Sequence, residues 1–373
     1  MRIIFFFTLF IGVMGLLNFY TYKRFLKKLH PPFNTYAFII PSILMIGEIL
    51  FVIEAVWNVF RDSPTLYYLL SASIGITFLL FVISIIYDLN LSLFKRVPFQ
   101  KSRRRFIKIA FDTTILIFAF SYLLKGFKGG LSKPILNTIN VDIKGFCEDD
   151  YVIMQLSDIH VGRSIKKSFV EELVQRVNAE NPDIVVITGD LIDHAIEKIK
   201  DDLSPLTALT APCYFILGNH EYFHRASETI AFMKGLGIRV LLNESVIVDN
   251  RFNLIGLTDV IGERIGEYPM DIDKAYKDID PALCTVVLGH QPKSILRLKG
   301  RPCDLMLSGH THGGQIFPFG LLVMVDQPYL AGLYQHNKDQ QIFVSRGAGY
   351  WGPPIRVLAP SEISKIIIKG SRV

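Results

Sequence analysis

The first third of the chain contains four long apolar stretches separated by short polar segments. They cover residues 3–22, 36–60, 66–88 and 106–124. A helix that crosses a bilayer needs about 20 mostly apolar residues, so these stretches predict four membrane-spanning helices. The fourth is the least uniform, because Lys108 and Asp112 interrupt its apolar run.

The remaining two thirds of the chain follow a different rhythm, in which a short apolar run ends in a polar motif. The run 184–187, for example, is β-branched and uniformly apolar, which is typical of a buried strand. Helical spacing of apolar residues follows at 168–180, and further helices are expected near 195–209 and 226–236. This alternation of strands and helices predicts an α/β sheet domain.

These two patterns divide the chain into three parts. Residues 1–125 form the predicted helical membrane region, and residues 140–373 form the predicted α/β domain. Residues 126–139 are expected to be a linker, because 126–134 is rich in Gly, Lys and Ser and contains a proline.

Charge placement predicts how the chain lies in the membrane. The net charge is +6, and the basic residues gather beside apolar stretches, which fits membrane orientation better than a nucleic-acid surface. The loops after the first and third stretches are the basic ones, so both are expected in the cytoplasm. If all four stretches cross, the α/β domain lies on the exoplasmic side of the membrane. If 106–124 does not cross, the domain is cytoplasmic.

Two further features of the membrane region have alternative interpretations. Residues 102–108 resemble a twin-arginine export signal, and a plain basic cluster is the other interpretation. Glu48 and Glu54 lie inside the second stretch, where charged groups are costly. They could contact a lipid headgroup or an ion path, or they could make polar pairs between helices.

Candidate metal ligands gather in the polar motifs that end the apolar runs of the α/β domain. The set is Asp158, His160, Asp190, Asn219, His290, His310 and His312. Ligands bind beyond the carboxyl ends of strands in such sheets, so these residues are expected to share one site. Imidazole, carboxylate and amide oxygen suit Mn²⁺, Fe, Zn²⁺ or Co²⁺. Seven donors are too many for a single ion, so we expect two ions.

The chemistry of such a pair of ions favours phosphoester hydrolysis. Asp190 is the natural bridge, because its carboxylate has two oxygens and it follows a glycine. Two ions about 3.5–4 Å apart clamp a phosphate and activate a water molecule as hydroxide. His220 lies beside the ligand Asn219 and is expected to give a proton to the leaving group.

The ordered motifs resemble those of the calcineurin-like metallophosphoesterases. They are D-x-H at 158–160, G-D-x-x-D at 189–193, G-N-H-E at 218–221, G-H at 289–290 and G-H-x-H at 309–312. The resemblance covers about 140–373, and residues 157–162, 309–315 and 345–363 are similar to the membrane-bound bacterial subgroup.

The resemblance implies a four-layer αββα sandwich and a division of the ligands between two divalent metals. Asp158, His160, Asp190 and His312 would hold the first metal, and Asp190, Asn219, His290 and His310 the second. Asp190 and His220 would be catalytic. Manganese is the expected metal, with Fe, Zn, Co or Mg as alternatives.

The expected partners are the lipid bilayer and an amphiphilic or lipid-linked phosphoester, with no nucleic acid. Some relatives of this kind cleave UDP-2,3-diacylglucosamine in lipid A synthesis, and this is the specific alternative. A transporter or receptor with a regulatory metal-binding domain is the alternative from another class.

Overall fold

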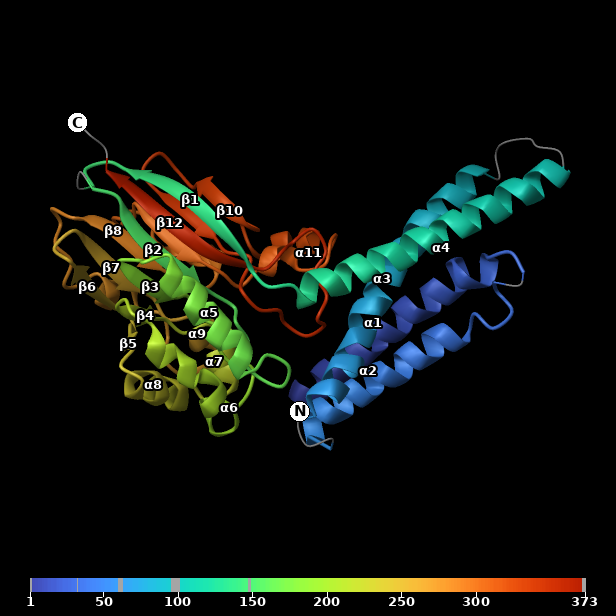
Figure 1. The fold of residues 1–373 in the computed structure, drawn as a ribbon, viewed down its shortest axis with the longest axis horizontal. Helices are drawn as coiled ribbons and strands as arrows, with labels where there is room; N and C mark the ends of the chain where they lie inside the picture. Colours follow the sequence, from blue (N-terminus) through green and yellow to red (C-terminus); the bar gives the residue numbers. More distant parts are fainter. Residues whose placement is uncertain (1, 32, 60–62, 95–100, 147–148, 371–373) are drawn as a thin grey trace. The chain divides into compact units, whose positions relative to one another are not determined.

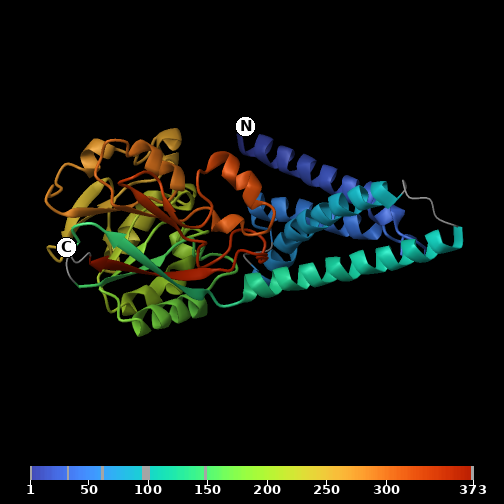
Figure 2. The same ribbon diagram turned by 90° about the horizontal axis from the view of Figure 1, so that it is seen from above.

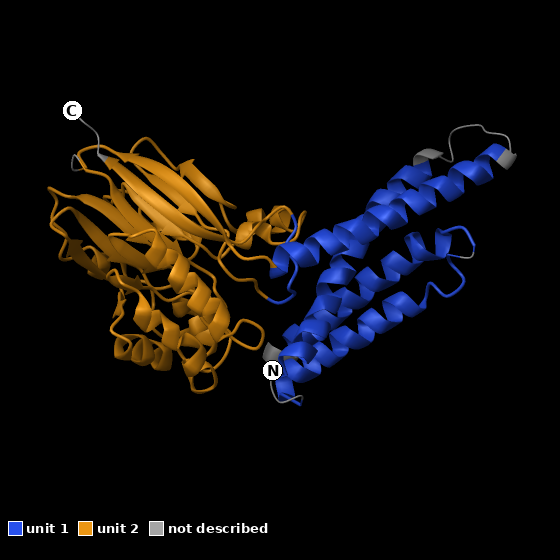
Figure 3. Cartoon of the chain, viewed as in Figure 1, with its two compact units in different colours: residues 1–131, 352–357 blue, residues 132–351, 358–373 orange. Residues whose placement is uncertain are grey.

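The computed structural model describes residues 2–31, 33–59, 63–94, 101–146 and 149–370. The chain divides into two compact units, coloured separately in Figure 3. The helical unit comprises Met1–Leu131 and Gly352–Val357, and the sheet unit comprises Ser132–Trp351 and Leu358–Val373. Residues 60–62, between the second and third apolar stretches, and residues 95–100, in the basic loop after the third, lie outside the described residues.

Four long helices make up most of the helical unit. They are α1 (Arg2–Arg24), α2 (Ile39–Trp57), α3 (Pro64–Phe94) and α4 (Lys101–Leu131), with a short 3₁₀ turn η1 (Leu26–Lys28) after α1. All four are long and apolar enough to cross a membrane. This confirms the prediction of a helical region with four apolar helices.

Polar side chains inside the helical unit make hydrogen bonds between helices. Glu48 of α2 is fully buried, and its two carboxylate oxygens accept hydrogen bonds from Asn18 Nδ2 of α1 at 3.0 Å and Thr77 Oγ1 of α3 at 2.6 Å. Of the two interpretations of this residue, the contacts favour pairing between helices.

The charged residues that interrupt the fourth apolar stretch neutralise each other. Lys108 and Asp112 are one helical turn apart and form an ion pair, and the Asp112 side chain is fully buried. Tyr87 of α3 donates a hydrogen bond to Asp112 Oδ1 at 3.0 Å. A paired carboxylate inside an apolar bundle costs far less than an isolated one, so this pair is compatible with a spanning helix.

The end of α4 differs from the sequence-based expectation of a linker over 126–139. The helix continues to Leu131, and strand β1 (Ile135–Ile143) begins only a few residues later. The glycines at the end of α4 have a packing role, because the segment Gly352–Val357 lies against them. A Cβ atom on Gly130 would lie 2.2 Å from the carbonyl oxygen of Pro354, and the N–H of Arg356 donates to the carbonyl of Gly126 at 2.9 Å.

The sheet unit is built from two six-stranded sheets, with strand orders β1-β12-β2-β3-β4-β5 and β10-β11-β9-β8-β7-β6. The remaining strands are β2 (Tyr151–Leu156), β3 (Ile184–Ile187), β4 (Cys213–Phe215), β5 (Arg239–Val240), β6 (Glu244–Val248), β7 (Phe252–Gly256), β8 (Cys284–Leu288), β9 (Leu305–Ser308), β10 (Gly332–Gln335), β11 (Gln341–Val344) and β12 (Glu362–Gly370). Strands β2, β3 and β4 run parallel, as do β7, β8, β9 and β11.

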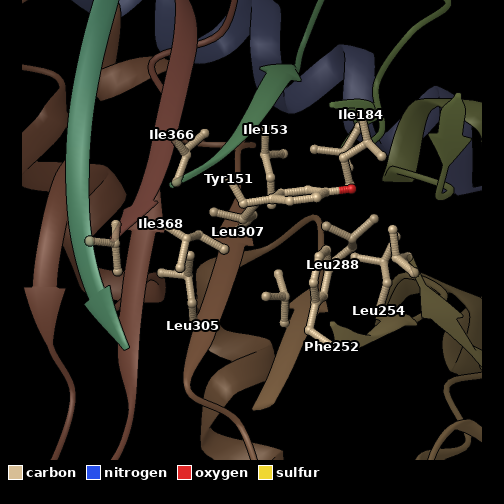
Figure 4. Packing of buried hydrophobic residues seen from close by; sticks show 14 of the residues in the cluster. Tyr151, Ile153, Ile184, Phe252, Leu254, Leu288, Leu305, Leu307, Ile366 and Ile368 are labelled. Atoms are coloured by element: carbon tan, nitrogen blue, oxygen red, sulfur yellow. The ribbon is translucent and has the colours of Figure 1, made fainter. Parts of the chain in front are cut away.

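The main hydrophobic core lies between the two sheets. Figure 4 shows Tyr151, Ile153 and Ile184 of the first sheet facing Phe252 and Leu254 of the second. Alternate residues of a strand point to opposite faces, so neighbours such as Val185 face the other side of the first sheet, where they are also fully buried. Both faces of the first sheet are therefore covered.

Helices form the outer layers of the sheet unit. The helices and 3₁₀ turns of the whole unit are α5 (Lys167–Ala179), α6 (Ile196–Leu203), η2 (Ser204–Ala208), α7 (Asn219–Phe223), α8 (Ala226–Gly235), α9 (Ile261–Ile265), α10 (Ile272–Ala275), η3 (Pro292–Arg297), η4 (His312–Gly314) and α11 (Gly320–Asp326). In Figures 1 and 2, α5, drawn in light green, lies beside the strands of the first sheet. On the second sheet, Tyr276 and Ile295 pack over Ile255 and Val287. This is the αββα sandwich that the resemblance to the metallophosphoesterases implies.

Candidate metal centre

Each predicted metal ligand lies just beyond the carboxyl end of a strand in one of the two sheets. Asp158 and His160 follow β2, Asp190 follows β3, and Asn219 begins α7 after β4. In the second sheet, His290 follows β8, and His310 and His312 follow β9. Because neighbouring parallel strands end at the same edge, these side chains come together.

The first cluster joins Asp158, His160 and His312. Nε2 of His160 lies 3.0 Å from Nε2 of His312, and Nε2 of His312 lies 3.5 Å from Oδ1 of Asp158. All three side chains are buried. Two imidazole nitrogens and a carboxylate oxygen pointing at one place form a donor set that suits a divalent transition metal.

The second cluster joins Asp190, Asn219, His290 and His310. Nε2 of His290 lies 3.2 Å from Oδ2 of Asp190 and 3.1 Å from Oδ1 of Asn219. One ring nitrogen or carboxylate oxygen each from Asp190, His290 and His310 lies within 4.8 Å of the others. Burial and the neighbouring His290 lower the pKa of His310 to about 3, so His310 is neutral, as a metal ligand has to be.

Asp190 lies between the two clusters. Its Oδ2 atom is 3.9 Å from Nε2 of His160 in the first cluster and 3.2 Å from Nε2 of His290 in the second. Burial alone would raise the pKa of Asp190, but His290 and His220 hold it well below its usual range. An ionised carboxylate between two donor sets is the geometry that a bridging ligand requires.

The backbone around the clusters is unusually tight. Asp158, Asp190 and His310 adopt φ angles of +51°, +49° and +71°, a region that non-glycine residues rarely occupy. A Cβ atom on Gly309 would lie 2.2 Å from Oδ2 of Asp158, and one on Gly218 would lie 2.3 Å from Oδ1 of Asp190. Glycine at these two positions lets one loop approach the carboxylate of another.

His220 does not belong to either ligand cluster but lies beside both. Its Nδ1 atom is 2.6 Å from Oδ1 of Asp193, and its Nε2 atom is 3.9 Å from Oδ2 of Asp190. Burial alone would lower the pKa of His220, but the charges of Asp190 and Asp193 outweigh burial and raise this pKa to about 9. Asp193 thus holds one ring nitrogen, which leaves Nε2 facing the clusters.

Sequence reasoning did not assign roles to Asp193 and Glu221, although both stand inside quoted motifs. The carboxylate of Glu221 is fully buried and accepts backbone hydrogen bonds from Gly218 and Asp190 at 2.6 and 3.0 Å. It also accepts hydrogen bonds from Leu191 and Ile192. The side chain thereby ties the loop after β3 to the loop after β4. The final letters of G-D-x-x-D and G-N-H-E were the signal for both residues.

Two large aromatic side chains flank His220. The ring of Phe223 lies 5.5 Å from the His220 ring and that of Trp351 lies 6.1 Å away, between ring centroids. Both aromatic side chains are exposed. Trp351 is fixed in place because its backbone N–H and carbonyl both bond to the side-chain amide of Gln315, at 3.0 and 2.9 Å.

The residues present fit a pair of divalent metal ions. Each cluster brings several nitrogen and oxygen acceptors close together. Without a metal ion, too few hydrogen atoms lie between these acceptors to form a hydrogen bond with each of them. His160 illustrates this, because its ring nitrogens lie close to His312, Asp190 and Asp193, and its buried Nδ1 has no hydrogen-bond partner among the residues that the structure describes. A cation between such donors removes the conflict.

Comparison with known proteins identifies the class to which this fold and site belong. Residues 151–314 match the family model described as calcineurin-like phosphoesterase. The chain belongs to this family and is a metallophosphoesterase, a hydrolase of phosphoester bonds that binds divalent metals.

Relatives of this chain include both bacterial and animal proteins. An uncharacterized metallophosphoesterase of Helicobacter pylori is 38% identical over 369 residues, covering 95% of this chain and 96% of the relative. A transmembrane protein with metallophosphoesterase domain from Bos taurus is 32% identical, covering 66% of this chain and 60% of the relative. The UDP-2,3-diacylglucosamine pyrophosphatase LpxG of Chlamydia trachomatis is 27% identical, covering 57% of this chain and 81% of that protein.

Proposed function

We propose that this chain hydrolyses a lipid-linked phosphoester of the bacterial envelope, with two divalent metals, manganese foremost, held by the seven predicted ligands. The observation that carries the proposal is the position of Asp190 between two donor clusters, each with two or more further ligands. When bound, such a pair of ions supplies an activated hydroxide and positive charge for the phosphate.

The chain's own residues complete the proposed reaction. Nε2 of His220 faces the clusters and gives its proton to the leaving oxygen, while Asp193 holds the opposite ring nitrogen at 2.6 Å. Asp158 is fixed by the backbone N–H of His310, which donates to both carboxylate oxygens at 2.9 and 3.0 Å. These contacts fix the ligands before substrate arrives.

The membrane helices support a substrate that lies in a bilayer. Four apolar helices tie the hydrolase to the membrane, and an anchored enzyme meets a lipid in two dimensions. The similarity to LpxG favours a second candidate, a pyrophosphatase that acts on UDP-2,3-diacylglucosamine. A domain on the exoplasmic side favours the first candidate, because nucleotide sugars of this kind lie in the cytoplasm.

Hydrolysis of a chromogenic phosphodiester by the purified full chain in Mn²⁺ tests the proposed site. Asp190→Ala and Asn219→Ala should abolish turnover and lower metal content. His220→Ala should keep both metals and lower kcat by about 10²–10⁴-fold. Asp273→Ala, at a position whose side chain is 86% exposed, is the matched control and should be unchanged.

The physiological substrate requires a second experiment. Lipid and nucleotide-sugar profiles of a deletion strain should show an accumulated phosphoester that the purified enzyme cleaves. Unchanged turnover in Asp190→Ala would contradict the proposed site, whereas an accumulated water-soluble ester would contradict the lipid substrate.

A further inference from the structure

Helix α11, which follows the G-H-x-H motif, is apolar and yet open to solvent. Leu321 is 67% exposed and Val325 85% exposed, and Leu322 and Met324 are exposed as well. Apolar side chains that project on most sides of a helix are normally covered. Exposed apolar surface of this kind marks a contact with a partner or a lipid.

Both ends of α11 are fixed to the loops that carry metal ligands. At its start, Gly320 packs so closely on Gly314 that a Cβ atom on Gly314 would lie 2.4 Å from the Gly320 Cα atom. At its end, Gln327 donates to Oε1 of Gln291 at 3.0 Å and accepts from the backbone N–H of Lys293 at 3.1 Å. The helix is therefore held beside the site by backbone and amide contacts, without burying its apolar side chains.

The charge around α11 limits what can cover it. Its single charged residue, Asp326, is paired with Nζ of Lys293 at 2.8 Å. The rest of the helix presents hydrocarbon, and the helix begins eight residues after His312, a candidate ligand of the proposed phosphoesterase site. A ligand that satisfies both features at once has a phosphoester head and a hydrocarbon chain.

We infer that α11, together with the exposed Phe317 and Phe319 that precede it, binds the hydrocarbon chain of the lipid phosphoester whose head lies at the metal centre. This inference rests on the proposed function. It assigns to α11 the preference for phosphoesters that carry a hydrocarbon chain. The occupant is a substrate chain rather than a protein, because the helix is uncharged apart from Asp326 and both of its ends are fixed to the loops that carry the proposed ligands His290 and His312.

Two p-nitrophenyl phosphodiesters that differ only in their second alcohol, methyl or hexadecyl, test the inference. Both release the same chromophore, and the full chain is assayed in Mn²⁺ at one fixed micelle concentration. The wild type should prefer the hexadecyl ester in kcat/KM. The double variant Leu321→Ser, Val325→Ser should lose about tenfold or more of this preference, since each methylene left in water costs about fourfold. Its kcat/KM for the methyl ester should not change.

A matched control separates α11 from exposed apolar residues in general. Ile247→Ser removes an exposed side chain from the edge strand β6 and should keep the full preference. A double variant that keeps the wild-type preference would overturn the inference and leave the proposed function intact. A wild type without any preference would overturn the lipid substrate itself. An equal loss on both esters would assign α11 a structural role, which also overturns the inference.

Discussion

We expect the carboxylate of Asp193 to orient His220, the proposed proton donor, and not to bind metal. It lies 2.6 Å from Nδ1 of His220 but 3.6 Å from Nδ1 of His160. Asp193→Asn should therefore keep both metals while kcat falls by about 10²–10³-fold, because the His220 ring loses its orienting partner. Metal content by elemental analysis and kcat on the same sample check this. Loss of a metal would mean that Asp193 is a ligand.

Glu221 is expected to matter for folding more than for binding. Its buried carboxylate accepts four backbone hydrogen bonds from two loops. In Glu221→Gln an amide NH₂ would face some of these donors, so we expect a loss of about 2–4 kcal/mol of unfolding free energy. Glu263→Gln, which breaks a surface pair with Arg297, should cost about 1 kcal/mol or less. Similar losses in the two variants, measured by thermal unfolding, would contradict this role.

Individual candidate ligands could be predicted from the sequence, but the contacts between them could not. Asp158, Asp190 and His290 each follow an apolar strand, and strand ends of an α/β sheet are where ligands gather. The roles of Asp193 and Glu221 depend instead on atoms in other loops. Glu221 reaches the backbone of Leu191, 30 positions earlier in the chain, and local sequence pattern carries no information about such a distance.

At the scale of elements, the close packing at the end of α4 predicts how a glycine substitution there changes stability. A Cβ atom on Gly130 would lie 2.2 Å from the carbonyl oxygen of Pro354, which is backbone and cannot move aside alone. Gly130→Ala should therefore destabilise the helical unit by about 1–3 kcal/mol. Gly235→Ala, in a helix where a Cβ atom meets nothing within 4 Å, should stabilise by up to about 1 kcal/mol.

The two glycine variants are compared by thermal unfolding of the full chain in detergent. A lower midpoint for Gly130→Ala together with an unchanged or higher midpoint for Gly235→Ala is the expected result. Equal shifts would mean that segment Gly352–Val357 does not rest on α4 in the folded protein.

Elements with a strong periodic pattern were predictable, and those defined by distant partners were not. The helix expected at 168–180 is α5 at Lys167–Ala179, because its apolar spacing is regular. The glycines after 125 suggested a linker, but they continue α4 because the segment Gly352–Val357 needs space there. Strand β12 pairs with both β1 and β2, and such pairing across more than half of the chain cannot be deduced from periodicity.

At the scale of the whole molecule, the crossing of α4 decides on which side of the membrane the proposed reaction takes place. The basic loops place the segment before α4 in the cytoplasm, so the sheet unit lies outside if α4 crosses and inside if it does not. The ion pair of Lys108 with Asp112 supports a crossing by α4, because it lowers the cost of the only two charged residues in the fourth apolar stretch. The same arrangement favours an envelope lipid over a nucleotide sugar as substrate.

Reporter fusions test the side of the membrane directly. An alkaline phosphatase fused after Val373 should be active, because this enzyme folds only outside the cytoplasm, and a fluorescent protein that folds only inside should stay dark there. Fusions after Gln100, before α4, should give the opposite pair of signals in either arrangement and serve as the control. A dark phosphatase and a bright fluorescent protein after Val373 would mean that α4 does not cross. The sheet unit would then face the cytoplasm, and the nucleotide-sugar pyrophosphatase would become the favoured function, because its substrate is found on that side.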